Sequence, residues 1–256
     1  MISQIKAEWK KLMFMNFTKI YLLILMISSL LLGITFSLTT NMTQGRALNE
    51  LPNIDVITAN LLGIDVGAIM LLVFTAIIIS SEFSTKFIHV VLAVTPQRGK
   101  VFFAKLAAFG IFSTCVSLII TSLTFSCGQF ILYINGRDMV SLADGNIIRL
   151  LAGCMAMPIF YCLITVCFTF LFRNSALSIT CSLGIMILPA FISWFDEKIQ
   201  MVLLPLLPRA ALHSLSGISE LGTESISIIR STISLLIWLS TLYMFALWNF
   251  KRKDII

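Results

Sequence analysis

The sequence predicts an all-α integral membrane protein, and two observations support this class. Of the 256 residues, 58% are hydrophobic and only 12% are charged, whereas an ordinary soluble domain carries about 25% charged residues. The apolar residues are also gathered into six segments of about 20 residues, the length that a helix needs to cross a hydrocarbon core of about 30 Å. These segments lack the period-two alternation of outer-membrane strands, so a β-barrel is excluded.

The six predicted spans follow one another without a second domain, so residues 1–256 are expected to form one transmembrane domain. The spans are Ile20–Leu38, Ile57–Ser80, Leu106–Ile134, Ile147–Phe172, Ala176–Phe195 and Ile228–Phe250. The third and fourth exceed the length that the bilayer requires and are expected to tilt or project. The first is too long for a signal peptide and no A-x-A site follows it, so we expect it to be retained.

Basic residues are unevenly distributed between the two sides of the predicted bundle. With the N-terminus inside, the cytoplasmic segments hold 12 of the 18 Lys and Arg residues but only three of the 12 acidic residues. The positive-inside rule therefore predicts that both termini are cytoplasmic. The net charge of +6 is then a signal of topology and of anionic lipid, and it gives little reason to expect a nucleic-acid partner.

Ahead of the first span, apolar and polar residues fall on opposite faces of a predicted helix. Trp9 and Leu12 lie on the apolar face, and Lys6, Glu8 and Lys10 lie on the polar face. This pattern predicts an amphipathic interfacial helix along the inner leaflet. Amphipathicity alone does not distinguish a membrane anchor from a surface that contacts a partner, so both roles remain open.

The segment between spans two and three, from Glu82 to Lys105, is predicted to form two helical pieces on the basic side of the membrane. Glu82 precedes Lys86 by four residues, the favourable order for a helical ion pair. An apolar stripe follows, made of Phe83, Phe87, Val90, Val91 and Val94. Thr95 is a good N-cap and Pro96 a good first-turn residue, so a second helix is expected to start there and to continue into span three.

This segment resembles the cytoplasmic coupling element of the ABC-2 type permeases, the membrane subunits of one class of ABC exporter. The shared order is an acidic residue at the end of span two, a Ser/Thr pair, an apolar helix, a Pro-x-Arg corner and a lysine that opens span three. The chain departs from many relatives at Thr85-Lys86, where they have Gly-Thr, and at His89, where a basic residue is common. The six spans with both ends inside are similar to this family as well.

The resemblance implies partners for the chain. A separate ABC ATPase subunit is expected to dock on the coupling residues, which are Glu82, Phe83, Phe87, Val91, Pro96 and Arg98. A second permease, identical or homologous, is expected to complete the transporter. The sequence has no G-x-x-x-x-G-K-[ST] motif, so ATP and Mg²⁺ are expected on the partner ATPase, and no residue of this chain is predicted to be catalytic or to bind a metal.

The resemblance also implies outward transport of a hydrophobic or amphipathic compound (a peptide, an antimicrobial or a lipid-like molecule) across the plasma membrane of a bacterium. Permeases that give immunity to lantibiotics act in this manner. An ATPase-independent transporter or channel, or a membrane scaffold, remains the alternative. The spans lack the intramembrane chain of charges found in ion-coupled transporters, which favours the ABC interpretation.

The connection before span six contains a ten-residue apolar run, Ile199 to Pro208. Such a run makes about 15 Å of helix, which is too short to cross the membrane. We therefore expect short re-entrant or interfacial outer helices here, with an ordinary surface loop as the alternative. The predicted outer gate consists of four leucines, Leu203, Leu204, Leu206 and Leu207.

Asp65 is the clearest ionisable residue inside a predicted span, which makes it a candidate for a functional role. Its position corresponds to the outer leaflet, close to a helix N-terminus, where the helix dipole favours a carboxylate. Asp65 is expected either to reach headgroups or Arg149, or to line the path of the cargo.

Overall fold

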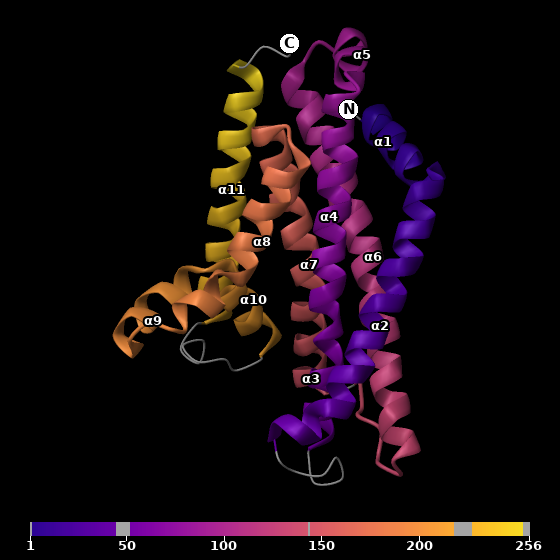
Figure 1. Cartoon of the computed structure of the whole chain (residues 1–256), viewed down its shortest axis with the longest axis vertical. Helices are drawn as coiled ribbons and strands as arrows, with labels where there is room; N and C mark the ends of the chain where they lie inside the picture. The colour runs from indigo at the N-terminus through magenta and orange to yellow at the C-terminus, as the bar shows by residue number, and fades with distance from the viewer. Residues whose placement is uncertain (1, 45–51, 143, 218–226, 253–256) are drawn as a thin grey trace.

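A computed structural model describes residues 2–44, 52–142, 144–217 and 227–252, and every regular element in these ranges is a helix (Figure 1). In chain order the elements are α1 (Ile2–Phe14), α2 (Asn16–Gln44), α3 (Asn53–Leu61), α4 (Gly63–Ser84), α5 (Phe87–Val94), α6 (Arg98–Ile134), α7 (Gly145–Phe172), α8 (Ser175–Ile192), α9 (Glu197–Leu203), the 3₁₀ turn η2 (Leu204–Leu206), α10 (Pro208–Ser216) and α11 (Ile228–Arg252).

The predicted number of membrane spans is confirmed, because six helical segments among the described residues are long and apolar enough to cross a bilayer. They are Asn16–Thr39, Asn53–Ser84, Arg98–Ile134, Gly145–Phe172, Ser175–Ile192 and Ile228–Arg252. The 37 residues of α6 make about 55 Å of helix, well beyond a hydrocarbon core of about 30 Å.

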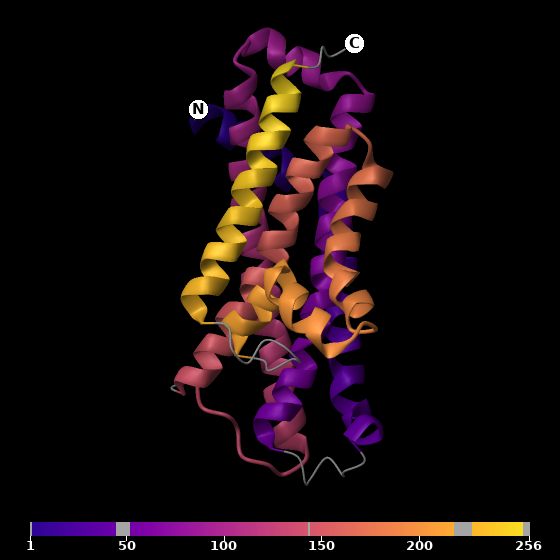
Figure 2. The ribbon, with the colours of Figure 1, turned by 90° about the vertical axis from the view of Figure 1, so that its left-hand side faces the viewer.

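The helices α4 and α7 form the centre of the bundle, and α2 and α11 lie on opposite sides of it (Figure 1). In α7, 67% of the most apolar window is buried inside the chain, compared with 11% in α11. The elements α1 and α5 and the C-terminal end of α11 lie at the same end of the bundle, which we call the α5 end (Figures 1 and 2). The helices α9 and α10 lie toward the other end, across the bundle axis, with α10 packed on α7 and α11.

The second predicted span is interrupted at Leu62, which separates α3 from α4. At the interruption, α2 approaches so closely that a β-carbon at Gly63 would overlap the carbonyl oxygen of Ser29 and lie 2.8 Å from the α-carbon of Gly33. The Ser29 hydroxyl donates a hydrogen bond of 2.7 Å to the Gly63 carbonyl oxygen. Small residues in both helices therefore create this contact, as is common between membrane helices.

The helix that continues into the third span is predicted to start at Thr95 and Pro96, and this start is wrong by a few residues, since α6 begins at Arg98. Thr95 is extended and ends α5, and its backbone N–H donates to the Val91 carbonyl oxygen. The Thr95 hydroxyl accepts a hydrogen bond of 2.7 Å from the Gln4 side chain of α1. Thr95 is thus used by a contact distant in sequence, so it does not cap the following helix.

Replacing Gly63 by alanine is expected to separate α2 from α4 and to lower stability by about 1–3 kcal/mol, because the added methyl meets backbone atoms. Thermal unfolding of the purified protein in detergent measures this. Gly184→Ala is the matched control, since a β-carbon at Gly184 meets no heavy atom within 4 Å. Equal melting temperatures for the two variants would contradict the close approach of α2 and α4.

Candidate functional site

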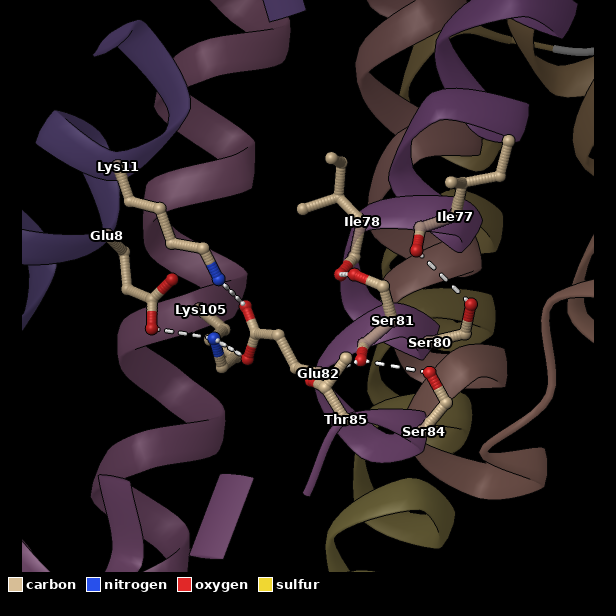
Figure 3. A network of polar contacts seen from close by, with 10 residues as sticks. All are labelled: Glu8, Lys11, Ile77, Ile78, Ser80, Ser81, Glu82, Ser84, Thr85 and Lys105. Carbon is tan, nitrogen blue, oxygen red and sulfur yellow. Dashed lines mark hydrogen bonds and ion pairs between the residues drawn. The ribbon is translucent and has the colours of Figure 1, made fainter. Parts of the chain in front are cut away.

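Four charged side chains from α1, α4 and α6 meet near the α5 end of the bundle (Figure 3). The Lys105 ammonium of α6 lies 2.6 Å from a carboxylate oxygen of Glu8 and 2.5 Å from one of Glu82. The Lys11 ammonium of α1 lies 2.7 Å from the other Glu82 oxygen. We call this group the ionic network.

The ionic network is largely removed from solvent. The Lys105 side chain is 0% exposed and that of Glu82 is 3% exposed. Burying an ion costs several kcal/mol unless opposite charges and hydrogen bonds compensate it, and here two carboxylates face two ammonium groups. The network therefore holds α1 against α4 and α6 in a defined position, since moving α1 would expose uncompensated charge.

Two sequence predictions about these residues are wrong. The ion pair between Glu82 and Lys86 does not form, because Lys86 adopts a left-handed conformation (φ 58°) between α4 and α5 and its side chain is exposed. Glu8 does not belong to a solvent-facing side of α1, because its carboxylate points to Lys105. Partners from distant helices outcompete the local pairing that sequence spacing favours.

Beside the ionic network lies an apolar groove between α1, α5 and α6, with a volume of about 450 Å³. Its lining is mostly aliphatic and aromatic, and includes Phe87, Val90, Val91 and Val94 of α5 and Val101 and Ala104 of α6. Glu8 and Lys11 also line the groove, and the Lys11 ammonium lies 4.9 Å from the centre of the Phe87 ring. The groove and the ionic network therefore share two side chains of α1.

The predicted coupling residues divide into two groups. Phe87 and Val91 line the groove, where Val90 and Val94 beside them are 59% and 82% exposed. Phe83 instead is partly buried at the edge of the core, where its ring packs edge-on against Phe170 and Phe250. Together with Glu82, it supports the end of α4 from within.

The remaining coupling residues, Pro96 and Arg98, lie at the connection between α5 and α6. Pro96 is exposed. The Arg98 guanidinium donates hydrogen bonds of 3.1 and 3.3 Å to the carbonyl oxygens of Phe250 and Lys251 at the C-terminal end of α11. Arg98 therefore joins the start of α6 to the end of the last span, where a helix C-terminus favours positive charge.

Arg173, in the turn between α7 and α8, covers the Phe83 ring at 5.8 Å. Burial, and secondly the positive charge of Arg98, lowers the pKa of Arg173. An arginine guanidinium stays protonated in proteins, so this side chain is still positively charged.

Sequence reasoning missed the ionic network. It placed Lys105 in the exposed loop because this residue directly precedes the predicted span. The available signal is that the neighbours of Lys105, from Val101 to Ala108, are all apolar, which is typical of a buried position in a helix. A buried lysine in such a run requires acidic partners.

At the other end of the bundle, the four leucines of the predicted outer gate differ in burial. Leu204 and Leu207 are buried against Ile192 of α8, whereas Leu203 and Leu206 are exposed. The indole N–H of Trp238 in α11 donates to the Leu206 carbonyl oxygen at 2.9 Å. The segment from α9 to α10 is thus attached to α8 and α11.

Asp65 lies in the first turn of α4, and the structure gives it a different basic neighbour from the one expected. A carboxylate oxygen of Asp65 is 3.6 Å from the guanidinium of Arg209 in α10. Arg149 instead donates hydrogen bonds of 2.6 and 3.2 Å to the carbonyl oxygens of Ser214 and Leu215, at the end of α10. The expected contact between Asp65 and Arg149 is therefore replaced by one to Arg209.

Comparison with known families identifies this architecture. Residues 4–189, which include the ionic network, the groove, the first four spans and most of the fifth, match the profile of a family described as ABC-2 family transporter protein. The chain belongs to the ABC-2 transporter family. It is the permease component of an ABC transporter, and permeases of this kind generally pair with an ABC ATPase. No curated protein matches the chain.

Lys105→Met is expected to destabilise the permease by about 3–5 kcal/mol, because it leaves the carboxylates of Glu8 and Glu82 with one ammonium group between them. The double variant Lys105→Met with Glu82→Gln should recover much of this loss, since Glu8 and Lys11 remain as a balanced pair. Thermal unfolding in detergent and the yield of membrane-inserted protein measure both variants. Lys100→Met, at an exposed position of the same helix, is the control, and strictly additive losses in the double variant would exclude the network.

Proposed function

We propose that this permease is the membrane subunit of an ATP-driven exporter, and that its ATPase subunit docks in the groove between α1, α5 and α6. The groove itself is the observation that carries the proposal. It is apolar, it lies at the α5 end of the bundle, and the ionic network fixes its α1 wall. Exposed apolar surface of this kind is typical of a protein interaction site.

In this proposal the α5 end faces the cytoplasm. Four exposed lysines, Lys6, Lys10, Lys86 and Lys100, belong to the elements and connections at this end, which agrees with the positive-inside rule. Both ends of the chain are then cytoplasmic, and α1 lies along the inner leaflet with Met13 and Phe14 exposed toward lipid. The membrane is the plasma membrane of a bacterium.

The ionic network supplies a route from the docked ATPase to the spans. Glu8 and Lys11 line the groove and also contact the charged ends of α4 and α6. A subunit that moves α5 or α1 therefore acts on Glu82 and Lys105 within the same rigid group. The docking surface includes Gln4, Glu8 and Lys11 in addition to the residues predicted from the sequence.

A second permease, identical or homologous, is proposed to complete the membrane part of the transporter. The apolar outer faces of α2, α8 and α11 support this, because only 22%, 22% and 11% of their most apolar windows are buried inside the chain. Lipid and a second permease are the two environments that suit such faces. The cargo then passes between the two permeases.

On the opposite side of the membrane, we propose that α9, η2 and α10 form short re-entrant or interfacial elements that close the exit. The cargo is a hydrophobic or amphipathic compound such as a peptide, an antimicrobial or a lipid-like molecule. The gate consists of four leucines, Leu203, Leu204, Leu206 and Leu207. Asp65 lies beside the path of the cargo. A hydrophobic constriction of this kind suffices to block ions and water.

The double substitution Phe87→Glu with Val91→Glu is expected to release the ATPase subunit from the permease, because two carboxylates in the groove would be desolvated by docking. Co-purification of the co-expressed ATPase with the tagged permease measures this, and the loss should be at least about tenfold.

Met139→Glu with Leu142→Glu is the matched control, since both side chains are exposed and lie between α6 and α7, far from α5 in the fold. Undiminished co-purification with the groove variant would refute docking in the groove. An environment-sensitive label at position 87 that responds to lipid but not to the ATPase would instead assign the groove to the inner leaflet.

Leu204→Ser with Leu207→Ser is expected to loosen the packing on Ile192, to raise basal ATP hydrolysis and to lower protection against the exported compound. Met201→Ser with Val202→Ser, at exposed apolar positions of the same segment outside the four gate leucines, is the control and should leave both readouts unchanged. ATPase rates of the reconstituted complex and growth in the presence of the compound measure both effects. A well-folded first variant with unchanged hydrolysis and resistance would make this segment a passive loop.

A further inference from the structure

Arg209, the second residue of α10, is incompletely satisfied. Its one ion-pair partner among the described residues is the Asp65 carboxylate, and the distance of 3.6 Å is too long for a hydrogen bond. A guanidinium has five N–H donors, and none of them donates a hydrogen bond within the described part of the chain. The side chain is nevertheless only 26% exposed, so water does not fully replace the missing partners.

Arg209 lines a crevice between α8, α9 and α10, with a volume of about 460 Å³. Leu204 and Pro189 supply apolar lining, and Ser193 and Gln200 supply polar lining. Glu197 is the other charged residue of the lining. The crevice therefore combines an under-coordinated cation with an apolar wall, which is the arrangement that an amphiphile with an anionic head requires.

The neighbourhood of Asp65 contains a second unsatisfied group. The Tyr161 hydroxyl of α7 is buried and has no hydrogen-bond partner within the part of the chain that the structure describes. It lies within electrostatic range of both Asp65 and Arg209.

We propose that Arg209 binds the anionic headgroup, a phosphate or a carboxylate, of an amphiphile whose apolar part lies against Leu204 and Pro189. In this arrangement Asp65 is an internal anion that occupies Arg209 when the crevice is empty, and it competes with the ligand. Glu197 also opposes an anion in the crevice. The proposal deepens the exporter function by naming a chemical class of cargo. It depends on the exporter function only if the bound amphiphile is cargo, since the same site could bind a bilayer lipid in any membrane protein.

The test is a titration of the purified permease in a neutral maltoside detergent with hexyl phosphate, compared with hexyltrimethylammonium and inorganic phosphate. We expect saturable binding of hexyl phosphate that is at least about tenfold tighter than binding of the other two probes. Arg209→Gln should weaken it by at least about tenfold, and Arg209→Lys should retain part of it. Lys198→Gln, at an exposed position of α9, is the control and should bind as the wild type does.

The decisive variants are those expected to bind hexyl phosphate more tightly than the wild type does, because a misfolded protein would not gain affinity. Asp65→Asn removes the internal competitor and Glu197→Gln removes the opposing charge, so each should tighten binding of hexyl phosphate several-fold. Wild-type binding by Arg209→Gln, or weaker binding by a folded Asp65→Asn variant, would overturn the proposal.

A separate measurement shows whether the bound amphiphile is cargo or bilayer lipid. Stimulation of ATP hydrolysis by hexyl phosphate in the reconstituted complex assigns the site to cargo, whereas binding without stimulation assigns it to a bilayer phospholipid. Loss of ATPase docking, by contrast, is measured by co-purification and does not depend on this crevice. Failure of the crevice proposal and failure of the exporter proposal are thus distinguishable.

Discussion

The position of α1 depends on the compensation of buried charge. An ammonium group with no solvent exposure, that of Lys105, lies in a helix that is otherwise apolar around it. It is tolerated there because two carboxylates from different helices lie within ion-pair distance, and because Lys11 balances the second carboxylate. Since removing one member of a buried ion pair is far more costly than removing both, the four side chains behave as one structural unit.

This unit explains how a short helix of 13 residues holds its place without a deep hydrophobic interface. Leu12 is buried and Trp9 packs edge-on against Phe112 at 6.3 Å, but several neighbours of these residues face outward. The charges add orientation, because an ion pair has a defined geometry whereas apolar packing is non-directional. The same side chains border the groove, so fixing α1 also fixes the surface beside α5.

The number of spans was predictable from the sequence because bilayer thickness sets the length of an apolar helix. The interruption at Leu62 and the late start of α6 were not, since they depend on the approach of Ser29 to Gly63 and of Gln4 to Thr95. The apolar stripe of α5 was also predictable, because helical spacing brings Phe87 and Val91 to one side. The partners of Glu82 were not predictable from the sequence. Local spacing favours a pair with Lys86, whereas the fold brings Lys11 and Lys105 to Glu82.

The charges at the two ends of the bundle contrast in a way that bears on function. In the ionic network each carboxylate has an ammonium partner at 2.7 Å or less, and the side chains of the central pair, Lys105 and Glu82, are only 0% and 3% exposed. At Asp65 and Arg209 the separation is 3.6 Å and both side chains are about one-quarter exposed, so the pair is weakly held and water or a ligand competes for it. A tight buried network suits a fixed connection to a motor subunit, whereas a loose pair beside a crevice suits the exchange of partners. Oppositely charged side chains thus form a fixed contact at one end of the permease and an exchangeable one at the other, and the difference lies in the distance between the charges and in the solvent access of the central pair.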